Sequence, residues 1–230
     1  MAKNCHIGVD NNSITPIPLS DNDCCGTTSI HTGIKEESAV AADSDSKAEG
    51  VLLVTFMHLP VEDVVFKSIF SKLNLKALFN LGNTCLMLRN MVLQYFQMLK
   101  VIDVGIFGSK ISERALIRLL SDNDRCCKLI LRNCKSSLTD HVLEPMLERN
   151  PHLTLVDLSN CTSLSNHSLQ TLSTNCSLLT CVTLAGCVWA TSEAVTNLGI
   201  CCTGLTQLDL SGCWNIDDDC ITTISSACSR

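Results

Sequence analysis

Apolar residues recur along residues 97–230 with a period of 26 or 27 residues. Leu153, Leu179 and Leu205 stand 26 residues apart, and the leucines and cysteines that follow them keep the same spacing. The segment CKLILRNC is an earlier copy, 27 residues upstream, and LKVIDVGIF begins a divergent first copy. Because such self-similarity is typical of stacked repeats, the sequence predicts five copies of about 26–27 residues each.

Each copy carries the pattern L-x-x-L-x-L-x-x-C, the leucine-rich-repeat signature. Its alternating stretch predicts a short strand with leucines pointing inward, and the following stretch predicts a helix that a second cysteine closes. One repeat cannot bury its own apolar face, so neighbouring repeats must stack. We therefore expect an α/β solenoid with parallel strands on the concave side, helices outside and an open C-terminal end.

Residues 51–96 change character and predict three short helices. Apolar residues recur behind the pair Leu59-Pro60, and Pro60 suits the first turn of a helix because its missing N–H costs nothing there. Before this segment, residues 1–50 hold eight acidic residues against three lysines and show no apolar period. They predict a disordered acidic tail, with Ser44 and Ser46 as candidate phosphorylation sites or as parts of a solvated linker.

Overall charge and hydropathy exclude several classes of function. The formal net charge is −6 and the pI is near 5.4, which disfavours nucleic acid and anionic membranes as partners. No apolar run approaches the ~18 residues of a membrane helix, and the start MAKNCHIGVDNN does not resemble a signal peptide. We therefore expect a cytoplasmic protein, or one that is also nuclear.

The 16 cysteines raise the question of metal or redox chemistry. A reducing compartment disfavours disulfides, and the closest pairs are adjacent residues, which make poor zinc chelates. Because eight cysteines fall at periodic positions, we expect packing roles, no metal and no cofactor; a zinc or redox protein remains the alternative. The histidines His141, His152 and His167 are not paired with a nucleophile, so no catalytic residues are predicted.

The segment LPVEDVVFKSIFSKLNLKALFNLGNTCLMLRN resembles an F-box, and the repeats resemble the cysteine-containing subclass of leucine-rich repeats. Repeats of this subclass commonly follow an F-box, as they do here. The resemblance covers about residues 57–230. It divides the chain into a tail (1–50), an F-box (51–96) and repeats (97–230). Two features depart from the common F-box pattern: the first helix is two residues longer, and Leu88 stands where many F-boxes carry tryptophan.

The resemblance implies a non-catalytic subunit of a Skp1–cullin–F-box ubiquitin ligase. The F-box would bind a Skp1-type adaptor, and through it cullin and RING subunits, while the repeats would bind a protein substrate for ubiquitination and degradation. The residues expected to contact the adaptor are Leu59, Pro60, Val64, Ile69, Phe70 and Leu73. Several of these residues would alternatively fill the core of the small helical segment.

Substrate contacts are expected on the concave face, at strand positions that alternate with the inward leucines. The candidates are Lys128, Ile130, Arg132, Leu155, Asp157, Thr183, Gln207 and Asp209, with Trp189 and Trp214 at one rim. Tryptophan is a favoured interface anchor, although packing against the next turn is the alternative for both. A repeat scaffold without ligase function, in which residues 57–95 only cap the stack, is the alternative for the whole chain.

Overall fold

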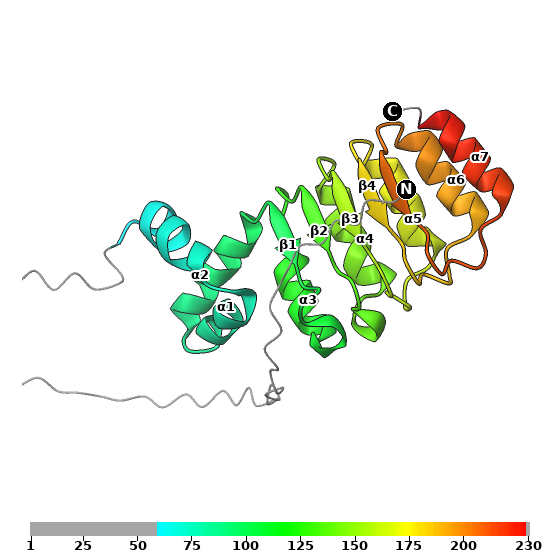
Figure 1. The fold of residues 1–230 in the computed structure, drawn as a ribbon. Helices are drawn as coiled ribbons and strands as arrows, with labels where there is room; N and C mark the ends of the chain where they lie inside the picture. Colours follow the sequence, from blue (N-terminus) through cyan, green and yellow to red (C-terminus); the bar gives the residue numbers. More distant parts are fainter. Residues whose placement is uncertain (1–58, 229–230) are drawn as a thin grey trace, which may run out of the picture. The chain divides into compact units, whose positions relative to one another are not determined.

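The computed structural model describes residues 59–228, which lie within one compact unit, and Figure 1 gives their arrangement. The predicted acidic tail (1–50), with Ser44 and Ser46, and residues 51–58 of the predicted F-box lie outside the described residues. The F-box and tail boundaries therefore stay predictions.

The first helix of the described chain is a π-helix, η2 (Val61–Ile69), followed by a short 3₁₀ turn, η3 (Phe70–Lys72). The carbonyl of Pro60 accepts hydrogen bonds from the N–H groups of Val64 and Val65 at 3.0 and 3.2 Å. Pro60 thus lies just before the helix, one position earlier than predicted. The two extra residues noticed in the sequence fall in this wider helix, whose bonds join residues five apart.

Two α-helices complete the N-terminal helical segment, which comprises residues 59–97. They are α1 (Leu75–Gly82), capped by the Asn74 side chain, and α2 (Leu86–Gln97). Phe66 and Phe70 pack against Tyr95 of α2 with ring centroids 5.5 Å apart. The three helical elements of this segment confirm the prediction of three short helices, with an aromatic cluster at their centre.

Five strands form one parallel sheet in the order of the chain. They are β1 (Val101–Asp103), β2 (Lys128–Ile130), β3 (Leu155–Asp157), β4 (Cys181–Thr183) and β5 (Gln207–Asp209). Paired residues are 27 apart between the first three strands and 26 apart thereafter, which equals the sequence period. The central residue of each of the first four strands is fully buried (Ile102, Leu129, Val156 and Val182). The predicted inward face is therefore confirmed.

Five helices follow the strands in turn and lie together on one side of the sheet (Figure 1). They are α3 (Glu113–Leu120), α4 (Asp140–Arg149), α5 (Asn166–Asn175), α6 (Ser192–Cys201) and α7 (Asp218–Ala227). Val195 and Leu198 of α6 are fully buried, but Ile221 of α7, which stands at the position of Val195 one repeat later, is 45% exposed. No described element packs beyond α7, which explains why this side chain is less covered than Val195.

The turns after β2, β3, β4 and β5 each contain a residue with a left-handed backbone. Asn133, Asn160, Gly186 and Gly212 occupy the same position in successive repeats, with φ between 58° and 74°. Glycine and asparagine are the residues that adopt this conformation at least cost. Each one directly precedes a turn cysteine, so the local sequence N-C or G-C aims the cysteine back into the core.

Candidate interaction surfaces

The predicted substrate residues of the strands all lie on the face of the sheet opposite the helices. Lys128, Gln207 and Asp209 are exposed, while the remaining five, Ile130, Arg132, Leu155, Asp157 and Thr183, are partly buried. The strand register aligns Ile130, Asp157, Thr183 and Asp209 in one row across four strands. The structure therefore brings these residues together on one surface, and their role in binding stays a prediction.

The aspartates in this row also support their own turns. The Asp157 Oδ1 atom accepts hydrogen bonds from the Ser159 N–H at 3.0 Å and from the Ser159 hydroxyl at 2.5 Å. Asp209 accepts from the Ser211 N–H at 2.9 Å in the same way. Within the described residues, neither carboxylate forms an ion pair, and the hydrogen bonds of both are accepted by Oδ1.

The two tryptophans have different environments. The Trp189 indole N–H donates to the Cys161 carbonyl at 2.7 Å, and the ring packs against the core. Trp189 is therefore anchored between two repeats, the alternative considered for it from the sequence. Trp214 is 83% exposed and occupies the position of Val188, not of Trp189, one repeat earlier.

Turn cysteines form a ladder of S–H···O contacts between repeats. The thiols of Cys161, Cys187 and Cys213 lie 3.0–3.1 Å from carbonyl oxygens of the preceding repeat. Burial raises the pKa of Cys161 and of Cys187 to about 12. A small side chain with a weak donor suits this site, and the raised pKa favours the protonated thiol.

A second ladder runs through the ends of the helices. Cys176, Cys202 and Cys228 follow α5, α6 and α7, and the Cys202 thiol lies 3.4 Å from the Cys176 carbonyl oxygen. The prediction that a second cysteine closes the helix is therefore confirmed for α5, α6 and α7, but not for α3 and α4. Asn123 and Asn150 stand at the same position in the earlier repeats.

Asn123 joins the repeats to the helical segment, a role that the sequence interpretation missed. Its buried Nδ2 donates to the carbonyls of Phe96 at 2.7 Å and Leu99 at 2.9 Å, and its Oδ1 accepts from the Arg125 N–H. The Asn150 side chain in turn donates to the Asn123 carbonyl at 2.7 Å. The available signal was the repeat period: Asn150 stands 26 residues before Cys176, and Asn123 stands 27 residues before Asn150.

The six residues predicted to contact an adaptor have unequal access to a partner. Pro60 is exposed and Leu73 is 37% exposed, whereas Leu59, Val64 and Ile69 are partly buried. Phe70 is fully buried, so it is a core residue here and not a surface anchor. The structure adds two exposed apolar residues of the same segment that the sequence interpretation missed, Val61 at 37% and Leu86 at 69% exposure.

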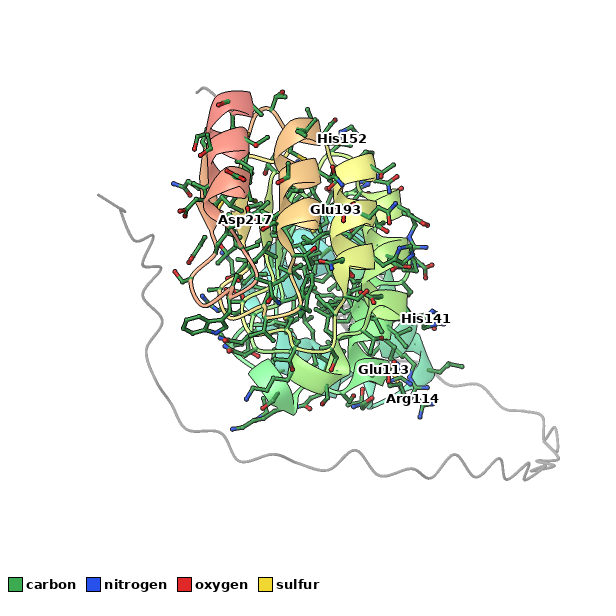
Figure 2. All side chains as sticks on the ribbon, turned by 90° about the vertical axis from the view of Figure 1, so that its right-hand side faces the viewer. Glu113, Arg114, His141, His152, Glu193 and Asp217 are labelled. Carbon is green, nitrogen blue, oxygen red and sulfur yellow. The ribbon has the colours of Figure 1, made fainter. Side chains whose placement is uncertain are left out.

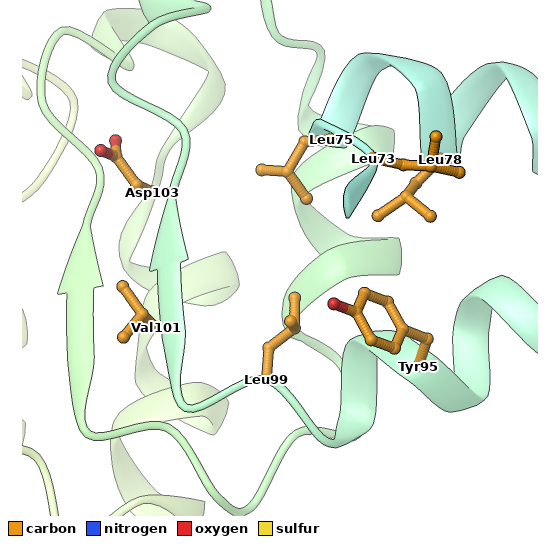
Figure 3. Close-up of a pocket in the computed structure, with 7 residues that line it drawn as sticks. All are labelled: Leu73, Leu75, Leu78, Tyr95, Leu99, Val101 and Asp103. Carbon is orange, nitrogen blue, oxygen red and sulfur yellow. The ribbon is translucent and has the colours of Figure 1, made fainter. Parts of the chain in front are cut away.

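A pocket of about 210 Å³ lies between the helical segment and β1. Its lining residues are Leu73, Leu75, Leu78, Tyr95, Leu99, Val101 and Asp103 (Figure 3). Burial raises the pKa of the Tyr95 hydroxyl. Because Val101 and Asp103 are outward positions of β1, the pocket extends the predicted substrate surface to the helical segment and includes Leu73.

Titratable side chains do not gather into a catalytic or metal centre in residues 59–228. His141, His152, Glu193 and Asp217 come from different parts of the repeat stack (Figure 2). Asp217 caps α7 by accepting a hydrogen bond from the Cys220 N–H at 2.8 Å. No group of three potential metal ligands was found within the described range.

The fold and this surface define a class of protein. Five parallel strands alternating with helices at a 26–27-residue period are consistent with a leucine-rich-repeat solenoid. Such a stack offers an extended face to macromolecules. In the described part of the chain, no helix is both long and apolar enough to cross a membrane.

Two curated relatives carry the comparison further. The chain is 33% identical over 108 residues to F-box/LRR-repeat protein 15 of Rattus norvegicus and, equally, to that of Mus musculus. The match covers 47% of this chain but only 36% of each relative, so it spans little more than a third of their length. No family model matches the chain. The similarity and the fold together support a leucine-rich-repeat protein.

Proposed function

We propose that this protein is the substrate-recognition subunit of a Skp1–cullin–F-box ubiquitin ligase. The observation that carries the proposal is a short helical segment with exposed apolar residues, followed directly by a repeat stack, in a chain similar to proteins named F-box/LRR-repeat. The helical segment would bind a Skp1-type adaptor, and the outward face of the sheet would bind the substrate. The chain itself performs no bond chemistry in this proposal.

Such a subunit acts by raising the effective concentration of the substrate near the ubiquitin-carrying enzyme. A fixed connection between the adaptor-binding and substrate-binding parts favours that action. The buried side chain of Asn123, which holds the end of α2 against the first repeats, supports such a connection. We therefore expect the helical segment and the repeats to move as one body.

The second candidate is a repeat scaffold without a ligase, for which the helical segment is only a cap. A cap would also show the aromatic cluster and the Asn123 bonds, so these features do not separate the two functions. A cap alone does not require Leu86 to be 69% exposed or Pro60 to be exposed beside Val61. Pro60 and Val61 are adjacent exposed apolar residues, and exposed apolar surface of this kind supports a partner-binding role.

Capture of the purified full chain on immobilised Skp1 tests the proposal. The test variant Pro60→Ala/Leu86→Ala removes two exposed side chains of the helical segment. The matched control Ile117→Ala/Leu178→Ala removes exposed apolar side chains of the repeats. We expect wild type and control to be retained and the test variant to lose roughly tenfold or more in affinity, as interface anchors do. A folded wild-type chain that Skp1 does not retain leaves the scaffold as the function.

A further inference from the structure

Charged side chains divide the described chain into two halves of opposite sign. Residues 150–228 contain six acidic residues and neither lysine nor arginine. Residues 59–149 contain 13 basic residues against nine acidic ones. With neutral histidines, the formal charge is therefore −6 for the half that contains β3, β4 and β5, and +4 for the half that precedes it.

The outward face of β3, β4 and β5 is an open sheet face in the acidic half. Asp157 and Asp209 point outward in the same row, with Thr183 between them. No described cation forms an ion pair with either carboxylate, and each uses only one oxygen for its own turn. This face is therefore formed by paired strands and is open to a partner. Its two carboxylates, Asp157 and Asp209, form no ion pair within the described chain.

Apolar side chains lie at the border of the same face. Leu155 occupies an outward position of β3, and Trp214 and Val188 follow the turn cysteines after β5 and β4. Val188, at the same position one repeat earlier, is 48% exposed although a complete repeat follows it. The exposure of Trp214 is therefore a property of this position and not only of the last described repeat. An exposed aromatic ring such as that of Trp214 also attracts the cations of lysine and arginine.

We propose that this face, named here the β3–β5 face, binds a basic, extended segment of a partner protein. The inference rests on the proposed function in one respect, since the partner would then be the substrate. Basic residues of the segment would meet Asp157 and Asp209, and its apolar residues would pack on Leu155 and Trp214. Phosphate-rich partners are disfavoured on the β3–β5 face itself, because the carboxylates of Asp157 and Asp209 repel anions.

Two cations of the neighbouring strand would set the direction of the segment. Lys128 is the first residue of β2, next to β3, and Arg132 follows two residues after the end of β2. They repel further basic residues and attract acidic ones, so a segment with a basic end is directed toward β5. Unlike charges placed along one surface provide orientation and specificity more than affinity.

Fluorescence anisotropy with three synthetic peptides tests the proposal on the full chain. The peptides have equal length and alternate leucine with arginine, with glutamate or with glutamine. We expect the arginine peptide to bind, its affinity to fall as salt is raised, and the glutamate peptide not to bind. Preference for the glutamate or glutamine peptide, or no binding by the arginine peptide, overturns the inference.

A pair of charge-matched variants locates the binding. Asp157→Asn/Asp209→Asn removes two charges from the β3–β5 face while keeping oxygens that accept the turn hydrogen bonds. Glu193→Gln/Asp219→Asn removes two charges from the outer helices α6 and α7, where Figure 2 labels Glu193. We expect the first variant to weaken arginine-peptide binding roughly three- to tenfold and the second to change it little. Equal weakening by both indicates nonspecific attraction and contradicts the proposal.

Failure of this inference is distinguishable from failure of the proposed function. Skp1 capture is measured on the same variants and does not depend on Asp157 or Asp209. A chain that binds Skp1 but not the arginine peptide refutes the basic partner alone. A chain that binds the arginine peptide through the β3–β5 face but not Skp1 keeps this surface and refutes the ligase function.

Discussion

Replacing Asn123 with alanine should destabilise the whole described unit. The side chain is fully buried and makes three hydrogen bonds, two as a donor to the carbonyls of Phe96 and Leu99 and one as an acceptor from the Arg125 N–H. Alanine fills none of these roles, so three backbone groups lose their partner where water has little access. The end of α2 is thereby released from the first repeats.

The expected loss follows from these groups. A buried polar group without a partner costs about 1–3 kcal/mol. The cost is smaller for the Arg125 N–H, because this group is only partly buried and the backbone around it can relax. We expect the free energy of unfolding to fall by roughly 3–5 kcal/mol. Asn123→Asp should be comparably harmful despite its equal size, because a carboxylate would face two carbonyl oxygens. Asn90→Ala, on the exposed side of α2, is the control and should change stability little.

Urea unfolding followed by circular dichroism measures these differences, and hydrogen exchange shows where protection is lost. Faster exchange in α2 and in the segment before β2 is the expected pattern. A loss below about 1 kcal/mol, the net value of an ordinary hydrogen bond, would refute the conclusion that Asn123 fastens the helical segment to the repeats.

Three further outcomes are expected. An alkylating reagent at about pH 8 should label the exposed Cys201 in the native chain. Its neighbour Cys202 should be labelled only after unfolding, because burial raises the Cys202 pKa to about 11. Equal labelling of the two thiols in the native chain would contradict this. Gly186→Ala should cost more stability than Gly212→Ala, because both have positive φ but only the first would force a Cβ against the Asn160 amide oxygen; thermal unfolding compares them. Burial raises the Asp140 pKa, but hydrogen bonds from Ser168 and Ser165 outweigh it and lower the pKa. The carboxylate therefore stabilises the fold above about pH 4 and loses this effect as the pH falls below that value. The difference in unfolding free energy between wild type and Asp140→Ala should accordingly become smaller below about pH 4. A difference that does not change with pH would contradict this.

The repeat register could be predicted from sequence because each repeat buries the same positions. A single period placed Leu129 and Val156 inward and Asp157 and Asp209 outward, and the structure agrees at each position. Stacking makes such predictions reliable, since every repeat meets the same neighbour on each side.

Predictions failed where the environment is not periodic. Phe70 was expected at a surface, but the π-helix before it turns its side chain into a cluster with Phe66 and Tyr95. Asn123 was missed because a buried asparagine replaces the cysteine that marks its position in later repeats. The two tryptophans look alike in sequence, yet one residue of difference in their distance from the turn cysteine separates an anchored indole from an exposed one.

The substrate surface was predicted as a set of positions, whereas its chemistry came from spatial arrangement. Alternation along each strand identified Lys128 and Asp209 as outward residues. Only the strand register shows that the cation and the carboxylate lie on one continuous face, on β2 and on β5. The pocket beside β1 was not predictable, because it requires Leu75 and Tyr95 of the helical segment to lie against a strand.

Peptide-resolved hydrogen exchange of the full chain, with and without purified Skp1, tests the central claim most directly. The account predicts that Skp1 slows exchange in the helical segment, residues 59–97, and leaves the outward strand positions of β2 to β5 unchanged. Unchanged exchange in the helical segment at saturating Skp1, or protection confined to the repeats, would contradict the adaptor function.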